Sequence, residues 1–203
     1  MKPKSGPILS FDKKYMFQEK KGEGGFGKAY VIMDRETHEE FIAKCNINPE
    51  NDEKVALFEQ EIEILKKLKD MNNPYIIRIK ESGYTNIDQL NQEGETKYMI
   101  LEYAKKRELF DYIVYAGQKG FGETFGKIIF SKILNGMRTI HELGYCHKDL
   151  SLSNIFLDEN YEPKIGDFGA AMENRDDLTG TIGTDKFRAP EINKSLPHNG
   201  QKC

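Results

Sequence analysis

Two short motifs in the second half of the chain restrict its chemistry more than any other feature. Asp149 is separated by four residues from Asn154, and Asp167 follows about a dozen residues later in the sequence Asp-Phe-Gly. Magnesium-dependent phosphoryl transfer needs such a set: one carboxylate orients the attacking hydroxyl, while an amide and a second carboxylate hold metal against the phosphates. Each motif alone could be a surface turn, but their order and closeness favour this chemistry.

A glycine-rich turn near the N-terminus contains Gly22, Gly24 and Gly27. The same pattern occurs in dinucleotide-binding proteins, where a helix follows the glycines at once. Here two β-rich runs, residues 28–33 and 39–45, surround a polar stretch and predict a hairpin. The strand after Gly27 therefore argues against a dinucleotide-dependent oxidoreductase and favours glycines that cover nucleotide phosphates.

Lys44 ends an apolar run, and this pattern predicts an anionic partner for its ammonium group. The alternative is a lysine at a strand end whose side chain extends into solvent. Apolar residues at three-to-four-residue spacing predict an amphipathic helix over residues 52–69. Glu61 lies near its apolar face and is the predicted partner of Lys44, whereas Glu59 and Glu63 are expected in solvent. The apolar positions of this helix are Phe58, Ile62, Leu65 and Leu68.

Composition limits the remaining possibilities. The chain has 203 residues, a net charge of −3 and a pI of about 5.9, so nothing indicates a nucleic-acid surface. We expect no membrane span, because no apolar run approaches about 18 residues, and the first seven residues lack an apolar signal region. Cys45, Cys146 and Cys203 have no metal-ligand spacing, which favours reduced thiols and an intracellular location, cytoplasmic or nuclear.

Taken in order, these motifs resemble those of a eukaryotic protein kinase domain of the serine/threonine type, over roughly residues 15–192. His147-Lys148-Asp149 is similar to the family's catalytic loop. Asp167-Phe168-Gly169 and Ala189-Pro190-Glu191 bracket an activation segment, residues 167–191. The other matching segments are the glycine turn at 22–27, the third-strand lysine motif at 41–44, the helix at 61–68 with its exit at 73–77, and the fifth strand and hinge at 98–104.

The resemblance implies an α+β, bilobal kinase-like fold for a domain at residues 15–203. Residues 15–102 would form a five-stranded antiparallel sheet with one helix, followed by a hinge at 102–106. Residues 107–203 would form a mainly helical and incomplete second lobe. Residues 1–14 would be an N-terminal extension, and 86–95 read as a loop. A central helix over 124–143 is expected to bury Ile128, Ile129, Ile133, Leu134, Met137 and Ile140.

The resemblance also implies an ATP site with Mg²⁺. Lys44, held by Glu61, would grip the α- and β-phosphates, and Asn154 and Asp167 would bind metal. The backbone of Glu102 and Ala104 would pair with adenine. The other implied positions are Leu101 as gatekeeper, Glu108 at the ribose, Phe156 as the adenine floor, Ala29 and Ile42 as its roof, and a regulatory stack of Leu65, Ile79, His147 and Phe168.

The chain departs from the family pattern at several positions. Ser151 stands where a lysine usually contacts the transferring phosphate, and losing such a contact costs on the order of 3 kcal/mol. Lys148 replaces an arginine and cannot make a bidentate fork to a phosphothreonine, so control by phosphorylation at Thr179 or Thr181 is expected to be weaker. The best-aligned position is Gly180. In the adenine roof, Ala29 replaces a usual valine and Ile42 a usual alanine.

The last departure is that the chain stops at Cys203, soon after Glu191. The family's domain continues with further helices, so we expect the apolar face of the central helix to lack part of its cover. The predicted function is an ATP- and magnesium-dependent protein kinase that phosphorylates serine or threonine in a protein substrate. The alternative is a nucleotide-binding, pseudokinase-like scaffold or fragment with little phosphotransfer; oligomeric state stays open.

Overall fold

The computed structural model describes residues 14–24, 27–46, 50–85, 96–117 and 122–202. These residues form two compact units. Unit 1 comprises Met1–Ile62 and Arg78–Tyr103, and unit 2 comprises Glu63–Ile77 and Ala104–Cys203. The predicted loop at 86–95 and almost all of the predicted N-terminal extension lie outside the described residues. No helix among the described residues is both long and apolar enough to cross a membrane.

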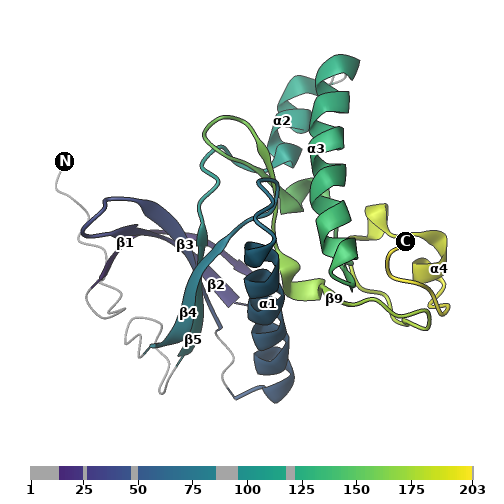
Figure 1. Cartoon of the computed structure of the whole chain (residues 1–203), viewed down its shortest axis with the longest axis horizontal. Coiled ribbons are helices and arrows are strands. Elements are labelled where there is room, and N and C mark those ends of the chain that lie inside the picture. The colour runs from purple at the N-terminus through teal and green to yellow at the C-terminus, as the bar shows by residue number, and fades with distance from the viewer. Residues whose placement is uncertain (1–13, 25–26, 47–49, 86–95, 118–121, 203) are drawn as a thin grey trace. The chain divides into compact units, whose positions relative to one another are not determined.

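Unit 1 contains a five-stranded antiparallel sheet (Figure 1). Its strands are β1 (Tyr15–Gly24), β2 (Gly27–Asp34), β3 (Glu40–Cys45), β4 (Ile79–Thr85) and β5 (Thr96–Glu102). Their order in the sheet is β1-β2-β3-β5-β4. The predicted sheet is therefore confirmed, as is the hairpin after the glycines, because β2 and β3 pair directly from Lys28↔Cys45 to Met33↔Glu40.

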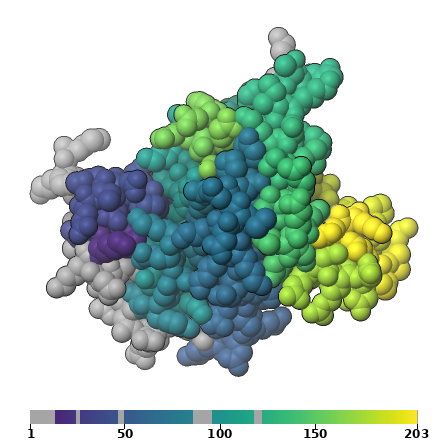
Figure 2. Space-filling model, in the orientation of Figure 1, coloured from purple at the N-terminus to yellow at the C-terminus, as the bar shows by residue number. Residues whose placement is uncertain are grey.

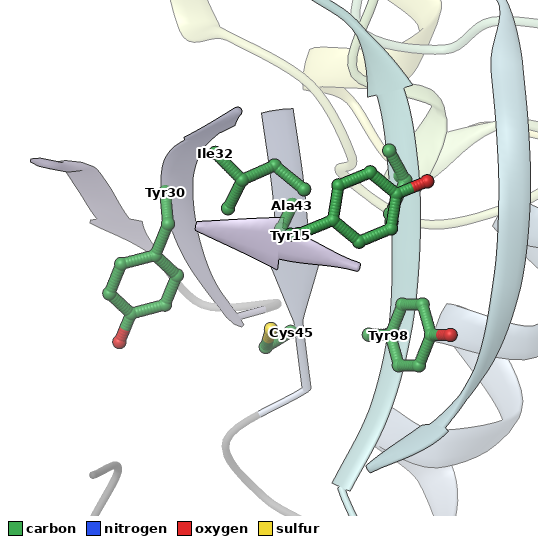
Figure 3. Close-up of a cluster of buried hydrophobic side chains, with 7 residues drawn as sticks. Tyr15, Tyr30, Ile32, Ala43, Cys45 and Tyr98 are labelled. Carbon is green, nitrogen blue, oxygen red and sulfur yellow. The ribbon is translucent and has the colours of Figure 1, made fainter. Parts of the chain in front are cut away.

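One face of this sheet carries the buried core of unit 1 (Figure 3). Side chains alternate between the two faces along a strand, and register partners share a face. Pairings such as Tyr30↔Ala43 and Ala43↔Ile100 therefore gather alternate residues of three strands. The cluster consists of Tyr15, Tyr30, Ile32, Ala43, Cys45, Tyr98 and Ile100. Burial raises the pKa of Cys45 to about 12, so its thiol stays neutral inside this cluster.

The opposite face of the sheet holds the residues with predicted nucleotide roles. Ala29 is the register partner of Lys44, and Ile42 is the partner of both Val31 and Leu101. The period of two places all five on one face. A one-residue shift in register would move every one of them to the core face, so the tyrosine-rich core fixes which face receives the lysine.

Helix α1 (Asp52–Asp70) confirms the predicted amphipathic helix. Its predicted apolar positions are nearly inaccessible to solvent. Acidic residues occupy the first turn and Lys67 and Lys69 the last, which complements the helix dipole. The buried apolar positions are Phe58, Ile62, Leu65 and Leu68.

Unit 2 combines helices with two small antiparallel ladders. The helices are α2 (Leu109–Ala116), α3 (Glu123–Glu142) and the short α4 (Pro190–Asn193). Strand β6 (Tyr145–Cys146) pairs with β9 (Met172–Glu173), and β7 (Ile155–Leu157) pairs with β8 (Pro163–Ile165). The β7–β8 hairpin separates the loop that contains Asp149 from the segment that begins at Asp167.

The buried side of α3 packs on β8. Gly136 makes this possible, because a Cβ there would lie 2.7 Å from the Ile165 side chain. Ile129, Ile133 and Ile140 lie on the same side and are buried. Two predicted core positions of this helix are wrong: Ile128 is 48% exposed and Leu134 52% exposed.

The error at these two positions has a physical cause. Helical spacing marks apolar positions but does not say which of them find a packing partner. Phe130 is also 61% exposed and lies one helical turn before Leu134, so apolar side chains lie on the outer side of α3. Figure 2 shows α3, in green, at the surface of the molecule. Contiguous exposed apolar surface of this kind is a liability for association.

We expect the isolated chain to self-associate through this outer side of α3. Replacing Phe130 and Leu134 with glutamine should lower the association measured by sedimentation velocity. The free energy of unfolding should change by no more than about 0.5 kcal/mol per site, because both side chains are exposed. The buried control Ile133→Ala should cost about 2–5 kcal/mol. Unchanged association in the double variant would contradict this role for the surface.

Candidate active site

In unit 1, Lys44 and Glu61 form a nearly buried ion pair. The Lys44 Nζ lies 2.8 Å from each carboxylate oxygen of Glu61, and the two side chains are 15% and 2% exposed. The competing carboxylates are used elsewhere: Glu59 pairs with Lys97, and Glu63 pairs with Lys66 at 2.9 Å. The predicted partner of Lys44 is therefore present, and a lysine that simply snorkels into solvent is excluded.

The glycine-rich turn joins β1 to β2. Gly22 is the register partner of Ala29, and Gly24 pairs with Gly27 at the end of the hairpin. Gly27 has a φ of +151°, and a Cβ there would lie 2.2 Å from the Cys45 carbonyl oxygen. Only glycine fits at that position. The tip of the turn, residues 25–26, lies outside the described residues.

In unit 2, the Asp149 carboxylate accepts hydrogen bonds from two segments. Its Oδ1 accepts from the backbone N and from the Oγ1 of Thr184, both at 2.8 Å. Its Oδ2 accepts from Asn154 Nδ2 at 3.1 Å. A carboxylate offers about four acceptor positions, so these donors fix its orientation and leave room at Oδ2 for a further hydroxyl donor.

The side-chain amide of Asn154 is oriented by Asp149. Its Nδ2 donates to the Asp149 carbonyl oxygen at 2.8 Å as well as to the carboxylate. Both amide hydrogens are committed in this way, so the amide oxygen is the atom that can serve as a metal ligand. The Asn154 backbone is also held, because its N donates to the Ser151 carbonyl and its carbonyl accepts from Gly166.

Asp167 is exposed and has a left-handed backbone, with φ 54° and ψ 76°. Non-glycine residues adopt this conformation rarely, and it concentrates at functional sites. The next residue, Phe168, is 1% exposed and packs against His147, with ring centroids 4.9 Å apart. The turn therefore sends Phe168 inward and leaves the Asp167 carboxylate near solvent.

His147 anchors this part of unit 2. Its Nε2 lies 3.0 Å from the Gly166 carbonyl oxygen, and burial lowers the pKa of the imidazole. His147, Phe168 and Leu65 of the predicted stack are all buried in unit 2. The fourth member, Ile79, is buried in unit 1.

The segment after the predicted hinge lies against β7. Lys106 N donates to the Leu157 carbonyl, and Glu108 forms an isolated bridge with Phe156. This bridge brings together the predicted ribose contact and the predicted adenine floor. Burial, with a smaller contribution from the nearby Asp111 charge, raises the pKa of Glu108.

The predicted hinge positions fall in two different units. Leu101 and Glu102 end β5 in unit 1, and Ala104 is buried in unit 2. The Glu102 amide donates to the Arg78 carbonyl at 2.8 Å, so a contact between Glu102 and adenine would fall on its carbonyl oxygen.

Sequence reasoning did not anticipate the contact between Thr184 and the Asp149 carboxylate, which are 35 positions apart in the sequence. The neighbour of Thr184, Gly183, has a φ of +97°, and a Cβ there would lie 2.4 Å from the Lys148 carbonyl oxygen. Nothing in the spacing of Gly183 and Thr184 indicates which carboxylate the threonine meets.

The donor set fits magnesium better than a metal held by protein ligands alone. Within the described ranges, no group of three or more His, Cys, Asp or Glu side chains is placed to hold a metal. Magnesium usually keeps several waters and binds through one or two carboxylates together with substrate phosphates. One carboxylate and one oriented amide oxygen, from Asp167 and Asn154, are compatible with that pattern.

Comparison with known proteins identifies the family. The family model of the protein kinase domain matches this chain over residues 15–203. The chain belongs to the protein kinase domain family. The bilobal prediction and the motif order are consistent with this match, and several of the relatives are named serine/threonine protein kinases.

Three relatives illustrate the similarity of this kinase domain. Human NUAK family SNF1-like kinase 1 is 33% identical over 193 residues, covering 92% of this chain and 27% of the relative. The serine/threonine-protein kinase GIN4 of Saccharomyces cerevisiae is 38% identical over 144 residues, covering 70% and 12%. The serine/threonine protein kinase OSK3 of Oryza sativa is 31% identical over 182 residues, covering 89% and 34%. The chain thus spans about a third or less of these relatives' lengths.

Breaking the Lys44–Glu61 pair should destabilise this kinase domain. Lys44→Met should lower the free energy of unfolding by about 3–5 kcal/mol, because it leaves a buried carboxylate without its partner. Adding Glu61→Met should recover much of that loss. Chemical denaturation measures both. Lys66→Met, which removes an exposed pair, is the control and should cost about 0–1 kcal/mol. Equal losses in Lys44→Met and Lys66→Met would contradict a buried pair.

Proposed function

We propose that this protein is an ATP- and magnesium-dependent kinase that transfers the γ-phosphate to a serine or threonine hydroxyl of a protein substrate. The observation that carries the proposal is the fixed carboxylate of Asp149, which Thr184 and Asn154 orient with three hydrogen bonds. A candidate base must first have the right geometry. The remaining acceptor position on Oδ2 suits the hydrogen of an incoming hydroxyl.

The proposed metal ligands are the Asn154 amide oxygen and the Asp167 carboxylate. Asn154 is pre-oriented by its two bonds to Asp149, and Asp167 is exposed on its left-handed turn. Bound Mg²⁺ would supply positive charge to the β- and γ-phosphates. The protein's own contribution is to hold these two oxygens in place before nucleotide binds.

On the nucleotide side, we assign phosphate contacts to Lys44 and to the backbone around Gly22, Gly24 and Gly27. The ammonium of Lys44 is held by both oxygens of Glu61, which restricts the side chain to one direction. A positioned charge loses less conformational freedom when it binds an anion. The proposed adenine contacts are the roof residues Ala29 and Ile42, the gatekeeper Leu101, the hinge backbone at Glu102 and Ala104, and Phe156, with Glu108 at the ribose.

The second candidate function is a nucleotide-binding scaffold that transfers little phosphate. Ser151 favours this alternative, because the residue brings no charge and is only 6% exposed. Its carbonyl oxygen accepts a hydrogen bond from the Asn154 backbone N. It serves the loop structurally and offers nothing cationic to a phosphate. The complete set of Lys44, Asp149, Asn154 and Asp167 favours the kinase.

The protein substrate and an intracellular site of action are part of this proposal. The relatives named above are protein kinases, and this chain covers only part of each. The proposal includes no nucleic-acid or membrane partner.

Transfer of radiolabelled phosphate from ATP to a serine/threonine peptide library tests the proposal. Wild-type transfer should require Mg²⁺. Asp149→Asn should lower kcat by about 10²–10⁴-fold with ATP binding retained, because it removes the proposed base and keeps the shape. Asp167→Asn should weaken Mg²⁺-dependent ATP binding as well, because a neutral amide replaces a carboxylate at the metal.

The matched control is Glu159→Gln, an exposed carboxylate on the β7–β8 turn, which should leave transfer unchanged. Magnesium-dependent ATP binding with no transfer above the Asp149→Asn background would select the scaffold. Wild-type rates in both aspartate variants would contradict the site assignment itself.

A second test concerns the adenine roof. Ala29 and Ile42 are diagonal neighbours on one sheet face, because their register partners are Lys44 and Val31. We expect Ile42→Ala to weaken ATP binding measured by calorimetry, and Ala29→Val added to it to recover affinity to within about 1.5 kcal/mol of wild type, because the volume is conserved. A double variant no better than Ile42→Ala would mean that the two side chains do not share a wall.

A further inference from the structure

The last described residues of unit 2 lie beside the activation segment (Figure 1). Leu178 and His198 exchange both backbone hydrogen bonds, with N–O distances of 3.0 and 2.9 Å. They form an isolated antiparallel bridge. We call residues 196–202 the strap.

Side chains extend this contact along the strap. Asn199 Nδ2 donates to Asp176 Oδ1 at 2.7 Å. The Gln201 backbone N donates to Asn174 Oδ1 at 3.1 Å. Together with the backbone bridge, these bonds tie three alternate positions of the activation segment to the strap, as in a short ladder.

The strap is in turn fixed to the body of unit 2. Gln201 Nε2 donates to the carbonyl oxygens of His141 and Tyr145, at 3.0 and 3.3 Å. Gly200 lies directly on Cys146, since a Cβ there would be 2.4 Å from the Cys146 Sγ. The activation segment is therefore held against the end of α3 and β6 by hydrogen bonds that require no phosphate.

From the strap, His198 reaches the loop of Asp149. Its side chain is buried, its Nε2 lies 2.8 Å from Lys148 Nζ, and its Nδ1 lies 2.9 Å from the Leu196 carbonyl oxygen. A carbonyl only accepts and an ammonium only donates. In this arrangement Nδ1 of His198 donates to the Leu196 carbonyl, and Nε2 accepts from Lys148.

Lys148 is held from two sides. Its backbone is left-handed, with a φ of 64°. Gly183 closes on its carbonyl, leaving no space for a Cβ, and His198 holds the end of its side chain. Lys148 immediately precedes Asp149, so its backbone sets the direction in which the Asp149 side chain leaves the loop.

We propose that His198 is a positioning residue for Asp149: its imidazole holds Lys148, and through the strap it places the activation segment without phosphorylation. The proposal rests on the proposed kinase function and adds to it a regulatory property.

Two substitutions with amide side chains each keep one of the two side-chain hydrogen bonds of His198 and remove the other. In His198→Gln the side-chain oxygen occupies roughly the place of Nε2, keeps an acceptor for Lys148 and does not titrate. In His198→Asn the amide occupies the place of Nδ1, keeps the bond to Leu196 and cannot reach Lys148. Both variants keep the backbone bridge to Leu178.

The test measures kcat and the KM for ATP on the whole chain at pH 8, with amide hydrogen exchange of residues 146–151 and 174–178. His198→Asn should lower kcat at least tenfold with the KM for ATP unchanged, and it should speed exchange in 146–151. His198→Gln should keep at least half the wild-type kcat and leave exchange in 146–151 unchanged.

Equal kcat in the two variants would overturn the positioning role. If wild type transfers no phosphate, the proposed function fails on its own. The exchange experiment still decides the strap in that case: faster exchange in 146–151 for His198→Asn but not for His198→Gln supports it, and equal exchange contradicts it.

Discussion

The hydrogen bonds to the Asp149 carboxylate are the constraint on which the proposed chemistry of unit 2 depends. They join the catalytic loop to Thr184 of the activation segment and to the Asn154 amide. One carboxylate therefore orients the proposed metal ligand, contacts the activation segment and keeps an acceptor position for the proposed substrate hydroxyl. Hydrogen bonds to a charged group contribute about 1.5–3 kcal/mol each. Displacing Thr184 or Asn154 would therefore change the orientation of the Asp149 carboxylate.

Unit 1 depends on a different constraint, the alternation of side chains across its sheet. The tyrosine-rich cluster on one face determines the register, and the register brings Lys44 to the other face, where Glu61 of α1 receives it. Because the pair is nearly buried, removing either partner leaves an unpaired charge in the interior and lowers the stability of the fold. Its position is thus determined by core packing, and its proposed role at the phosphates follows from that position.

The sequence was informative where a residue type has one common use at a given spacing. The glycine turn followed by β-rich runs predicted the hairpin, and the apolar spacing predicted α1 and α3. It failed for Ile128 and Leu134, because helical periodicity cannot tell which apolar positions find a partner. It also did not anticipate the contacts of Thr184 and His198 with Asp149 and Lys148, since they join positions 35 and 50 apart in sequence. The roles of the site residues remain predictions.

The most direct measurement of the central claim compares Thr184→Ser with Thr184→Val in a phosphotransfer assay with parallel ATP-binding measurements. Serine keeps the hydroxyl that donates to Asp149, whereas valine keeps the shape and loses it. We predict near-wild-type transfer for Thr184→Ser and a loss of about 10- to 100-fold for Thr184→Val, from one hydrogen bond to a charged group, with ATP affinity unchanged in both. Wild-type transfer by Thr184→Val would contradict the claim that this carboxylate must be held in place for catalysis.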